Sequence, residues 1–438
     1  MLPGAKMPSL RTRTAVAAAR ATTTPPTALE LPRPPPPLVL GAVEALFRIQ
    51  PLFDAATRRA RATIVDRAAA IGLDWESEKR LLCDAVADWP AAVDAVRRER
   101  QGGSAGAAGA GGAGAGLYPS YYEMPFHAYK DGNLSLDAAF EVGVAAAAVH
   151  ATVFAPPSGG AAAAGSLPDP RGDQRLRESY MAAALGLLRE LEAEGLLSFA
   201  VPAPSGSGGG GKSGGDSAGQ PPPLRAVDFG AATGLSSLAL AEALGPSAEV
   251  TGVDLSPHFV AVGRVEMARR RQRAAGERLM GGAADAAAAA AAPAAPASPA
   301  SPPPAAARVA LMHAAIEDTG LPPASFDLVS MCLVAHELPR QASRDALREA
   351  KRLLKPGGAL CLMDMDPSSA AFRRIYASPF ALAAFKSTEP WLTEYVALDA
   401  LREVADAGLE GRSVRAAACS PRHRVIVASA PMGYRATP

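Results

Sequence analysis

The chain has few cysteines, little net charge and no long hydrophobic run, and each shortage argues against a class of protein. Its 438 residues include four cysteines, none of them in a C-x-x-C pair, so neither a disulfide framework nor a zinc site follows. The formal net charge of +1 offers no basic surface typical of nucleic-acid binding. The longest smooth apolar run, residues 142–154, is too short to cross a bilayer and carries His150.

Acidic side chains are absent from the first 29 residues. This segment contains seven Ser or Thr residues and four basic ones, Lys6, Arg11, Arg13 and Arg20. Such a composition is typical of an organellar transit peptide, and the lack of an apolar core argues against a secretory signal. We therefore expect a transit peptide or disordered segment over residues 1–37, with a plain basic tail as the alternative.

Low-complexity stretches divide the rest of the chain. They are rich in Gly, Ala, Ser and Pro and have little apolar surface to offset the entropy of ordering. The composition predicts a helical region, a Gly/Ala linker, a second helical region with an insertion, a Gly/Ser/Pro linker, and an α/β domain with a disordered insertion. These parts cover residues 38–100, 101–117, 118–201 (insertion 156–168), 202–223 and 224–431 (insertion 274–307).

The most informative motif is a strand, a glycine-bearing turn and a helix, followed by a second strand that ends in a carboxylate. The turn reads Asp228-x-Gly230-x-x-x-Gly234, and Asp254 ends the next predicted strand, 249–254. Glycines let the backbone approach a ligand, a helix start presents free N–H groups, and an acid at this distance can hold a ribose. A dinucleotide site would need glycine at two further positions, which Ala232 and Leu235 occupy, so NAD is disfavoured.

Together with two later segments, this motif resembles the class I S-adenosylmethionine-dependent methyltransferases. Residues 325–329 (SFDLV) are similar to the family's fourth strand, and residues 352–358 (RLLKPGG) to the turn before its fifth. Gly357 and Gly358 are expected to end the helix before that turn. The resemblance is closest to the type-11, ubiquinone/menaquinone-methyltransferase-like branch, in particular its plant and algal plastid members. It implies an α/β, Rossmann-like sheet of seven strands in the order 3-2-1-4-5-7-6 with strand 7 antiparallel, behind an N-terminal helical region and with low-complexity insertions.

The resemblance also implies S-adenosylmethionine as the cofactor and a set of residues around it. In the family, the turn surrounds the methionine end, the acid holds the ribose, and the segments after strands 3 and 4 lie beside the adenine and under the sulfonium. Ala232 stands where the family usually has glycine, and Ala315 where it has aspartate. The corresponding residues are Asp228, Gly230, Ala232, Gly234, Asp254, Leu255, Ala315, Ile316, Glu317 and Met331.

Residues for the methyl acceptor are less well defined. His336 and Glu337 follow the predicted strand 326–332 at the carboxyl edge, where they serve as a base or orienting pair, or His336 only shapes the loop. Tyr121, Tyr122 and His127 belong to an aromatic segment that covers a flat or lipophilic acceptor, or else packs between domains. Lesser candidates are Asp364, Asp366, Glu389 and Trp391, and we expect no metal site.

The resemblance implies methyl transfer to a small acceptor, lipophilic or aromatic. Together with the composition of the first 29 residues it also favours the chloroplast, with the mitochondrion as the alternative location. The predicted partner is this small molecule, with no nucleic acid and no membrane span. A methyltransferase acting on RNA or protein, and a silent cofactor-binding scaffold, remain as alternatives. The tetrad [DNS]-P-P-[YFW] of enzymes that methylate base amino groups is absent after strand 4, where the chain reads VAHELP (residues 334–339).

The insertion at 274–307 joins the predicted sheet at its N-terminal edge, whereas ligands of open α/β sheets bind at the carboxyl edge. Deletion of residues 281–305 is therefore expected to leave cofactor affinity unchanged in calorimetry. A large loss of affinity would contradict this placement of the insertion.

Overall fold

A seven-stranded sheet organises the protein. The computed structural model describes residues 36–47, 49–103, 118–127, 129–155, 167–203, 223–289 and 303–434, and the predicted transit peptide lies outside them except for its last two residues. The strand order is β3-β2-β1-β4-β5-β7-β6, and β7 pairs antiparallel with both neighbours. The predicted order and the reversed strand are thus confirmed. The strands are β1 Arg225–Phe229, β2 Glu249–Asp254, β3 Val309–His313, β4 Phe326–Cys332, β5 Leu354–Met365, β6 Arg415–Ala418 and β7 His423–Ser429.

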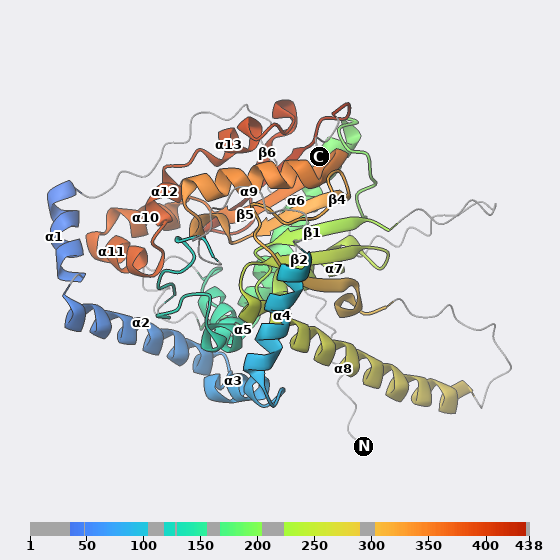
Figure 1. Ribbon diagram of the computed structural model, residues 1–438, viewed down its shortest axis with the longest axis horizontal. Helices are drawn as coiled ribbons and strands as arrows, with labels where there is room; N and C mark the ends of the chain where they lie inside the picture. The colour runs from blue at the N-terminus through green and yellow to red at the C-terminus, as the bar shows by residue number, and fades with distance from the viewer. Residues whose placement is uncertain are drawn as a thin grey trace, which may run out of the picture.

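Helices cover both faces of this sheet, as expected for strands that are buried on both sides. The first face carries α4 to α8, and the second carries α9 to α13 (Figure 1). The helices are α1 Pro37–Phe47, α2 Gln50–Ala70, α3 Trp75–Cys83, α4 Trp89–Gly103, α5 Leu136–His150, α6 Gly172–Ala193, α7 Leu235–Leu244, α8 Pro257–Ala289, α9 Arg340–Leu353, α10 Ala370–Ala377, α11 Pro379–Thr388, α12 Leu392–Val396 and α13 Ala400–Asp406. Short 3-10 turns are η1 Ala305–Arg308, η2 Ala335–Glu337 and η3 Gly411–Ser413.

The two helical regions that composition separates from the α/β domain share its core. Trp89 of α4 packs edge-on against Phe140 of α5, with ring centroids 5.1 Å apart. Tyr180 of α6 is fully buried against the sheet, and its hydroxyl donates to the backbone oxygen of Cys361 in β5 at 3.1 Å. One continuous apolar cluster therefore runs from the N-terminal helices to the strands, which low-complexity linkers in the sequence do not reveal.

The Lys-Pro-Gly-Gly turn differs from its predicted role as a helix end. Helix α9 ends earlier, at Leu353, because Leu354 is extended and Pro356 cannot continue a helix. β5 begins at Leu354, and Gly357 adopts a left-handed φ of 71° within it. The N–H of Gly357 donates to the Ala430 oxygen at 3.1 Å, and its carbonyl accepts from the Ser198 N–H at 3.0 Å.

Helix α8 is longer than the composition suggests. At its start, the Ser256 hydroxyl accepts from the Phe259 N–H at 3.2 Å. It then continues to Ala289, through the first part of the stretch 274–307 that was expected to be a disordered insertion. Alanine is the strongest helix former, so an alanine-rich stretch favours the extension of a helix.

Gly357→Ala is expected to lower the free energy of unfolding by about 2 kcal/mol, because a Cβ there meets left-handed strain. That Cβ would also lie 2.8 Å from the Ser198 nitrogen. Gly411→Ala is the matched control, since a Cβ at Gly411 meets nothing within 4 Å. Urea denaturation measures the stability of both variants, and equal stabilities would contradict the requirement for glycine at position 357.

Candidate functional site

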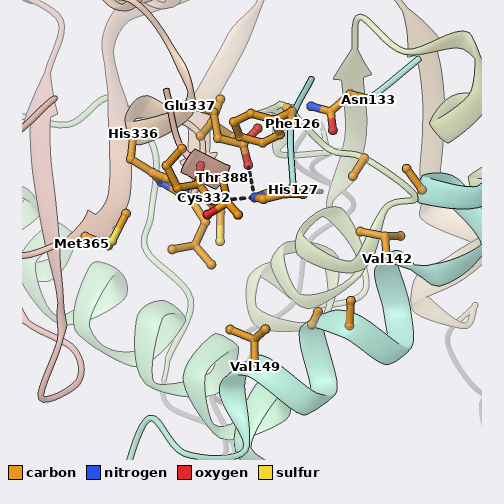
Figure 2. Close-up of a pocket in the computed structure, with 18 of the residues that line it drawn as sticks. Phe126, His127, Asn133, Val142, Val149, Cys332, His336, Glu337, Met365 and Thr388 are labelled. Carbon is orange, nitrogen blue, oxygen red and sulfur yellow. Dashed lines mark ion pairs between the residues drawn. The ribbon is translucent and has the colours of Figure 1, made fainter. Parts of the chain in front are cut away.

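A cavity of about 800 Å³ opens at the carboxyl ends of β1, β2, β4 and β5. Its volume suits a small-molecule site, and its place is the one where open α/β sheets bind ligands. Residues 121–133 and parts of α2, α5, α10 and α11 close it from the other side. Figure 2 shows the polar residues His127, Glu337 and Thr388 gathered together, with Val142 and Val149 of α5 across the cavity from them.

The glycine turn after β1 forms one wall of the cavity. Gly230 has a φ of 65°, and a Cβ there would lie 2.4 Å from a methyl group of Val334. Ala232 has a φ of 46°, a left-handed conformation that costs alanine about 1–2 kcal/mol and explains why glycine is usual at this position. The turn therefore needs its first glycine for space as well as for conformation.

Asp254 ties this turn to the end of β2. Its carboxylate accepts from the Ala232 N–H and from the Ser256 N–H, both at 2.8 Å. Burial raises the pKa of the Asp254 carboxyl to about 6, against the lowering effect of these hydrogen bonds and of the Tyr122 hydroxyl. The group lines the cavity, so a ligand with two hydroxyls can reach it.

Asp228 lies behind the turn. Its Oδ2 accepts from the Ser236 hydroxyl at 2.6 Å and from the Ser237 hydroxyl at 2.8 Å, both in the first turn of α7. Its Oδ1 is buried, and no described residue hydrogen-bonds to it. The side chain thus supports the turn rather than lining the cavity.

The predicted cofactor residues accordingly divide into two sets. Those on the cavity wall are Gly230, Ala232, Asp254, Leu255, Ile316 and Glu317, together with the segment 332–334 after β4. Those that do not reach the wall are Asp228, Gly234, Ala315 and Met331. Met331 belongs to β4 and packs in the core on the α9 face of the sheet. Because β4 is buried on both faces, its sequence does not show which of its side chains point to which face.

His336 is oriented by Asp364. Its ring Nδ1 lies 2.7 Å from Asp364 Oδ1, and its backbone N–H donates to Asp364 Oδ2 at 3.1 Å. The other ring nitrogen, Nε2, is therefore the one available to a ligand in the cavity. Although burial alone would lower the pKa of the His336 imidazole, the Asp364 carboxylate raises it to about 10. The imidazole is therefore a cation at neutral pH, which a sequence pattern does not reveal.

His127 lies close to two acids of the site, Glu389 and Glu337. Its Nε2 lies 2.8 Å from Glu389 Oε1. It also lies 4.0 Å from Glu337 Oε1, and Figure 2 shows these two side chains facing each other. Burial would lower the pKa of His127, but Glu389 and Glu337 raise it. Burial raises the pKa of the Glu337 carboxyl well above its usual range, against the effect of the two histidines. Glu389, a lesser candidate in the sequence, is thus a direct partner in the site.

Tyr121 and Tyr122, predicted at the acceptor end, lie instead at the end that holds Asp254 and Glu317. The Tyr121 hydroxyl donates to Glu317 Oε1. The two tyrosine rings are nearly perpendicular, at 89° with centroids 6.3 Å apart. The predicted acceptor group therefore splits, with His127 near His336 and the tyrosines near Asp254.

The sequence analysis missed Arg177 of α6, which also lines the cavity. Its guanidinium donates twice to Asp173, at 3.0 and 3.1 Å, and Asp173 lies 2.6 Å from His150 Nδ1. Arg177 lies between the buried residues Leu176 and Tyr180, so only its place on the inner face of α6 could have indicated it.

The cavity wall fits S-adenosylmethionine on three observations. Asp254 supplies a carboxylate for the ribose, the space at Gly230 admits a ligand against the backbone, and Glu317 Oε2 is buried with no hydrogen-bond partner among the described residues. Within those same ranges, no three His, Cys, Asp or Glu side chains are grouped so that they could hold a metal ion.

Comparison with known proteins supports the same class. A family model described as "Methyltransferase domain" matches residues 227–362. Demethylmenaquinone methyltransferase of Staphylococcus aureus (strain JH9) is 27% identical over 157 residues, which are 36% of this chain and 49% of the relative. The match thus spans about half of the relative's length.

Two solved structures are similar to part of this chain. A SAM-dependent methyltransferase from Aquifex aeolicus has 16% identity and a TM-score of 0.30, over 47% of this chain and 81% of the other. An O-methyltransferase family protein from Burkholderia thailandensis has 15% identity and a TM-score of 0.32, over 60% and 64%.

The sheet order and the glycine turn with its acid are those of class I S-adenosylmethionine-dependent methyltransferases, and residues 227–362 match the methyltransferase-domain model. The matched region extends from β1 to β5, and the helices before β1 and the segment after β5 complete the cavity. Among the described residues, no helix has the length and apolar character needed to span a membrane.

Asp364→Asn is expected to lower the pKa of His336 from about 10 toward its ordinary value of about 6.5. Since the folded-state pKa is the higher one, stability from this ionisation is fully present below about pH 6.5 and is lost as the pH rises toward 10. NMR titration of the imidazole measures the shift. The control is Asp366→Asn, because the Asp366 carboxylate accepts from the Ser368 hydroxyl and not from His336. An unchanged His336 pKa in Asp364→Asn would contradict the pairing of His336 with Asp364.

Proposed function

We propose that the chain transfers a methyl group from S-adenosylmethionine to a small, lipophilic acceptor that must lose a proton. The observation that carries this proposal is the position of His336 and Glu337, which face an apolar cavity directly beside the glycine turn. The name of the partial relative, demethylmenaquinone methyltransferase, favours an acceptor of the same character.

The part of the cavity away from the acids supports a lipophilic acceptor. One face of α5 lines it with Ala138, Val142, Ala145 and Val149, which recur at helical spacing. Trp75 adds an aromatic surface from the start of α3. Small side chains on α5 leave room between α5 and α2, and an apolar group bound there would be removed from water at about 25 cal/mol per Å² of buried surface.

The cofactor supplies an electrophilic methyl group, so the chain's residues have to align the acceptor and manage one proton. His336, a cation held by Asp364, donates from Nε2 to the acceptor and stabilises negative charge on it. Glu337, whose pKa is raised toward the working pH, accepts the proton. Of the roles that the sequence left open for this pair, the proposal gives that of the base to Glu337 and that of the orienting, charge-stabilising group to His336.

Residues 118–127 are joined to the end of α11 beside the reacting groups. The His127 N–H donates to the Thr388 oxygen at 3.3 Å, and the His127–Glu389 ion pair joins the same two segments. Water that entered between them would weaken the hydrogen bonds of the reacting groups.

We also propose that the protein acts in the plastid: the composition of residues 1–29 favours an organelle, and the resemblance to plant and algal plastid members favours the plastid over the mitochondrion. These residues lie outside the described ranges. A fusion of residues 1–40 to a fluorescent protein tests the location, and fluorescence in mitochondria would contradict it.

Methyl transfer is tested with a plastid extract, the purified chain and radiolabelled S-adenosylmethionine. The label is expected in the lipid fraction. Label confined to RNA or protein would contradict a small lipophilic acceptor, and calorimetry with S-adenosylhomocysteine establishes separately whether the cofactor site is intact.

His336→Ala is expected to reduce turnover by about 10²- to 10⁴-fold, because one charge-stabilising donor is lost. The affinity for S-adenosylhomocysteine should stay within about twofold, since His336 lies outside the turn and its acid. His336→Gln keeps a donor and should recover part of the rate. Equal losses of turnover and affinity would contradict the assigned role.

A further inference from the structure

Arg422 brings a positive charge to the cavity from the loop between β6 and β7. Because β7 runs antiparallel to β5, its first residue, His423, pairs with Met365 at the end of β5. Arg422 therefore lies at the edge of the sheet where the cavity opens, and its half-buried side chain lines the cavity.

Arg422 differs from the other arginines of the cavity wall, because it has no acid as a partner. The other two, Arg61 and Arg177, each form an ion pair with an acid, at 2.8 and 3.0 Å. Arg422 Nη2 donates to the backbone oxygen of Thr152 at 2.7 Å and lies 3.4 Å from its hydroxyl. Within the described ranges, no carboxylate lies at ion-pair distance from this guanidinium.

A second arginine adds to the positive charge at this place. Burial lowers the pKa of the Arg422 guanidinium, and the neighbouring Arg67 of α2 lowers it further. Arg67 likewise has no ion pair with any described acid. A half-buried cation that has lost water and lies near a like charge gains from a bound anion, which relieves both costs.

The acids of the cavity wall lie with other elements. They follow β2 or β3, belong to η2, or follow α11, and they are Asp254, Glu317, Glu337 and Glu389. None of them acts on the pKa of Arg422. The cavity thus has a positive end at the loop before β7, and the apolar face of α5 leads to it, since Thr152 follows α5 directly.

We propose that Arg422 binds a carboxylate of the methyl acceptor, so that the acceptor is a lipophilic acid whose apolar body lies against α5. This inference rests on the proposed function and narrows the class of acceptor. A guanidinium has five N–H donors in a rigid fork that matches the two oxygens of a carboxylate. Thr152 uses one of these donors, so an edge of the fork stays free for the acceptor.

The carboxylate of the cofactor belongs to a different part of the sheet. Its methionine end is expected at the turn after β1, and the sheet order β1-β4-β5-β7 separates that turn from Arg422. Three strand spacings correspond to about 14 Å. Arg422 instead neighbours the end of β5, where Asp364 holds His336, so one acceptor can reach both groups.

The test uses two flat probes that differ only in charge, biphenyl-4-carboxylate and biphenyl-4-carboxamide. Calorimetry measures their binding to the full chain saturated with S-adenosylhomocysteine. Wild type should bind the carboxylate about 10- to 100-fold more tightly, as expected for hydrogen bonds to a charged group. Arg422→Met should reduce this ratio to about twofold or less, because methionine keeps the apolar length and loses the charge. Arg402→Met is the control, since exposed Arg402 pairs with Asp406 on α13.

Two further variants keep the test decisive if Arg422→Met does not fold. Arg422→Lys retains the charge without the fork and should keep part of the preference for the carboxylate. Arg67→Met leaves the bond between Arg422 and Thr152 in place, and it should weaken the carboxylate probe about two- to fivefold without affecting the amide. Circular dichroism of each variant separates a loss of folding from a loss of binding.

Equal affinities of wild type for the two probes, or binding of neither, would overturn the inference. A wild-type ratio in Arg422→Met, or in both further variants, would overturn it as well. If Arg422→Met weakens S-adenosylhomocysteine and not the carboxylate probe, Arg422 holds the cofactor and the inference is wrong. If S-adenosylhomocysteine does not bind wild type, the proposed function itself fails, while the two probes still measure the role of Arg422 on the chain alone.

Discussion

The hydrogen bonds of Asp254 are the interaction on which the site depends. One oxygen holds the turn after β1 through Ala232, and the other holds the start of α8 through Ser256. Two neighbouring strands are thereby fixed to each other at the edge where the cavity opens. Because Asp228 supports the same turn from behind, through Ser236 and Ser237, the turn is held on both sides and leaves its inner face free for a ligand.

The aromatic segment gives this edge its second wall. At one end it brings Tyr121 to Glu317, and at the other it brings His127 to Glu389. The same short stretch therefore contacts the end of the cavity that holds Glu317 and the end that holds Glu389. A single segment that bonds both ends can align two ligands with each other, which methyl transfer in line requires.

Much of the fold could be predicted from the sequence, because its signals are local. The strand 225–229, its turn and Asp254 lie within 30 residues, and all occur where they were predicted. The Lys-Pro-Gly-Gly turn was placed wrongly as a helix end, since the role of Gly357 depends on backbone contacts with Ser198 and Ala430, far away in the chain. The core that α4 to α6 share with the sheet was not predicted either, because low-complexity linkers in a sequence do not show how the segments on either side of them pack together.

The sequence by itself determined the class of the protein, because glycine, acid and strand patterns at fixed spacing encode a cofactor turn with few alternatives. Only the tertiary structure decided what the individual acids and histidines do. His336 becomes a cation because Asp364, 28 residues later, lies 2.7 Å from it, and Glu317 keeps one free oxygen because Tyr121, 196 residues earlier, takes the other. Charge and hydrogen-bond capacity depend on neighbours in space, and the chain brings those neighbours together only when it folds.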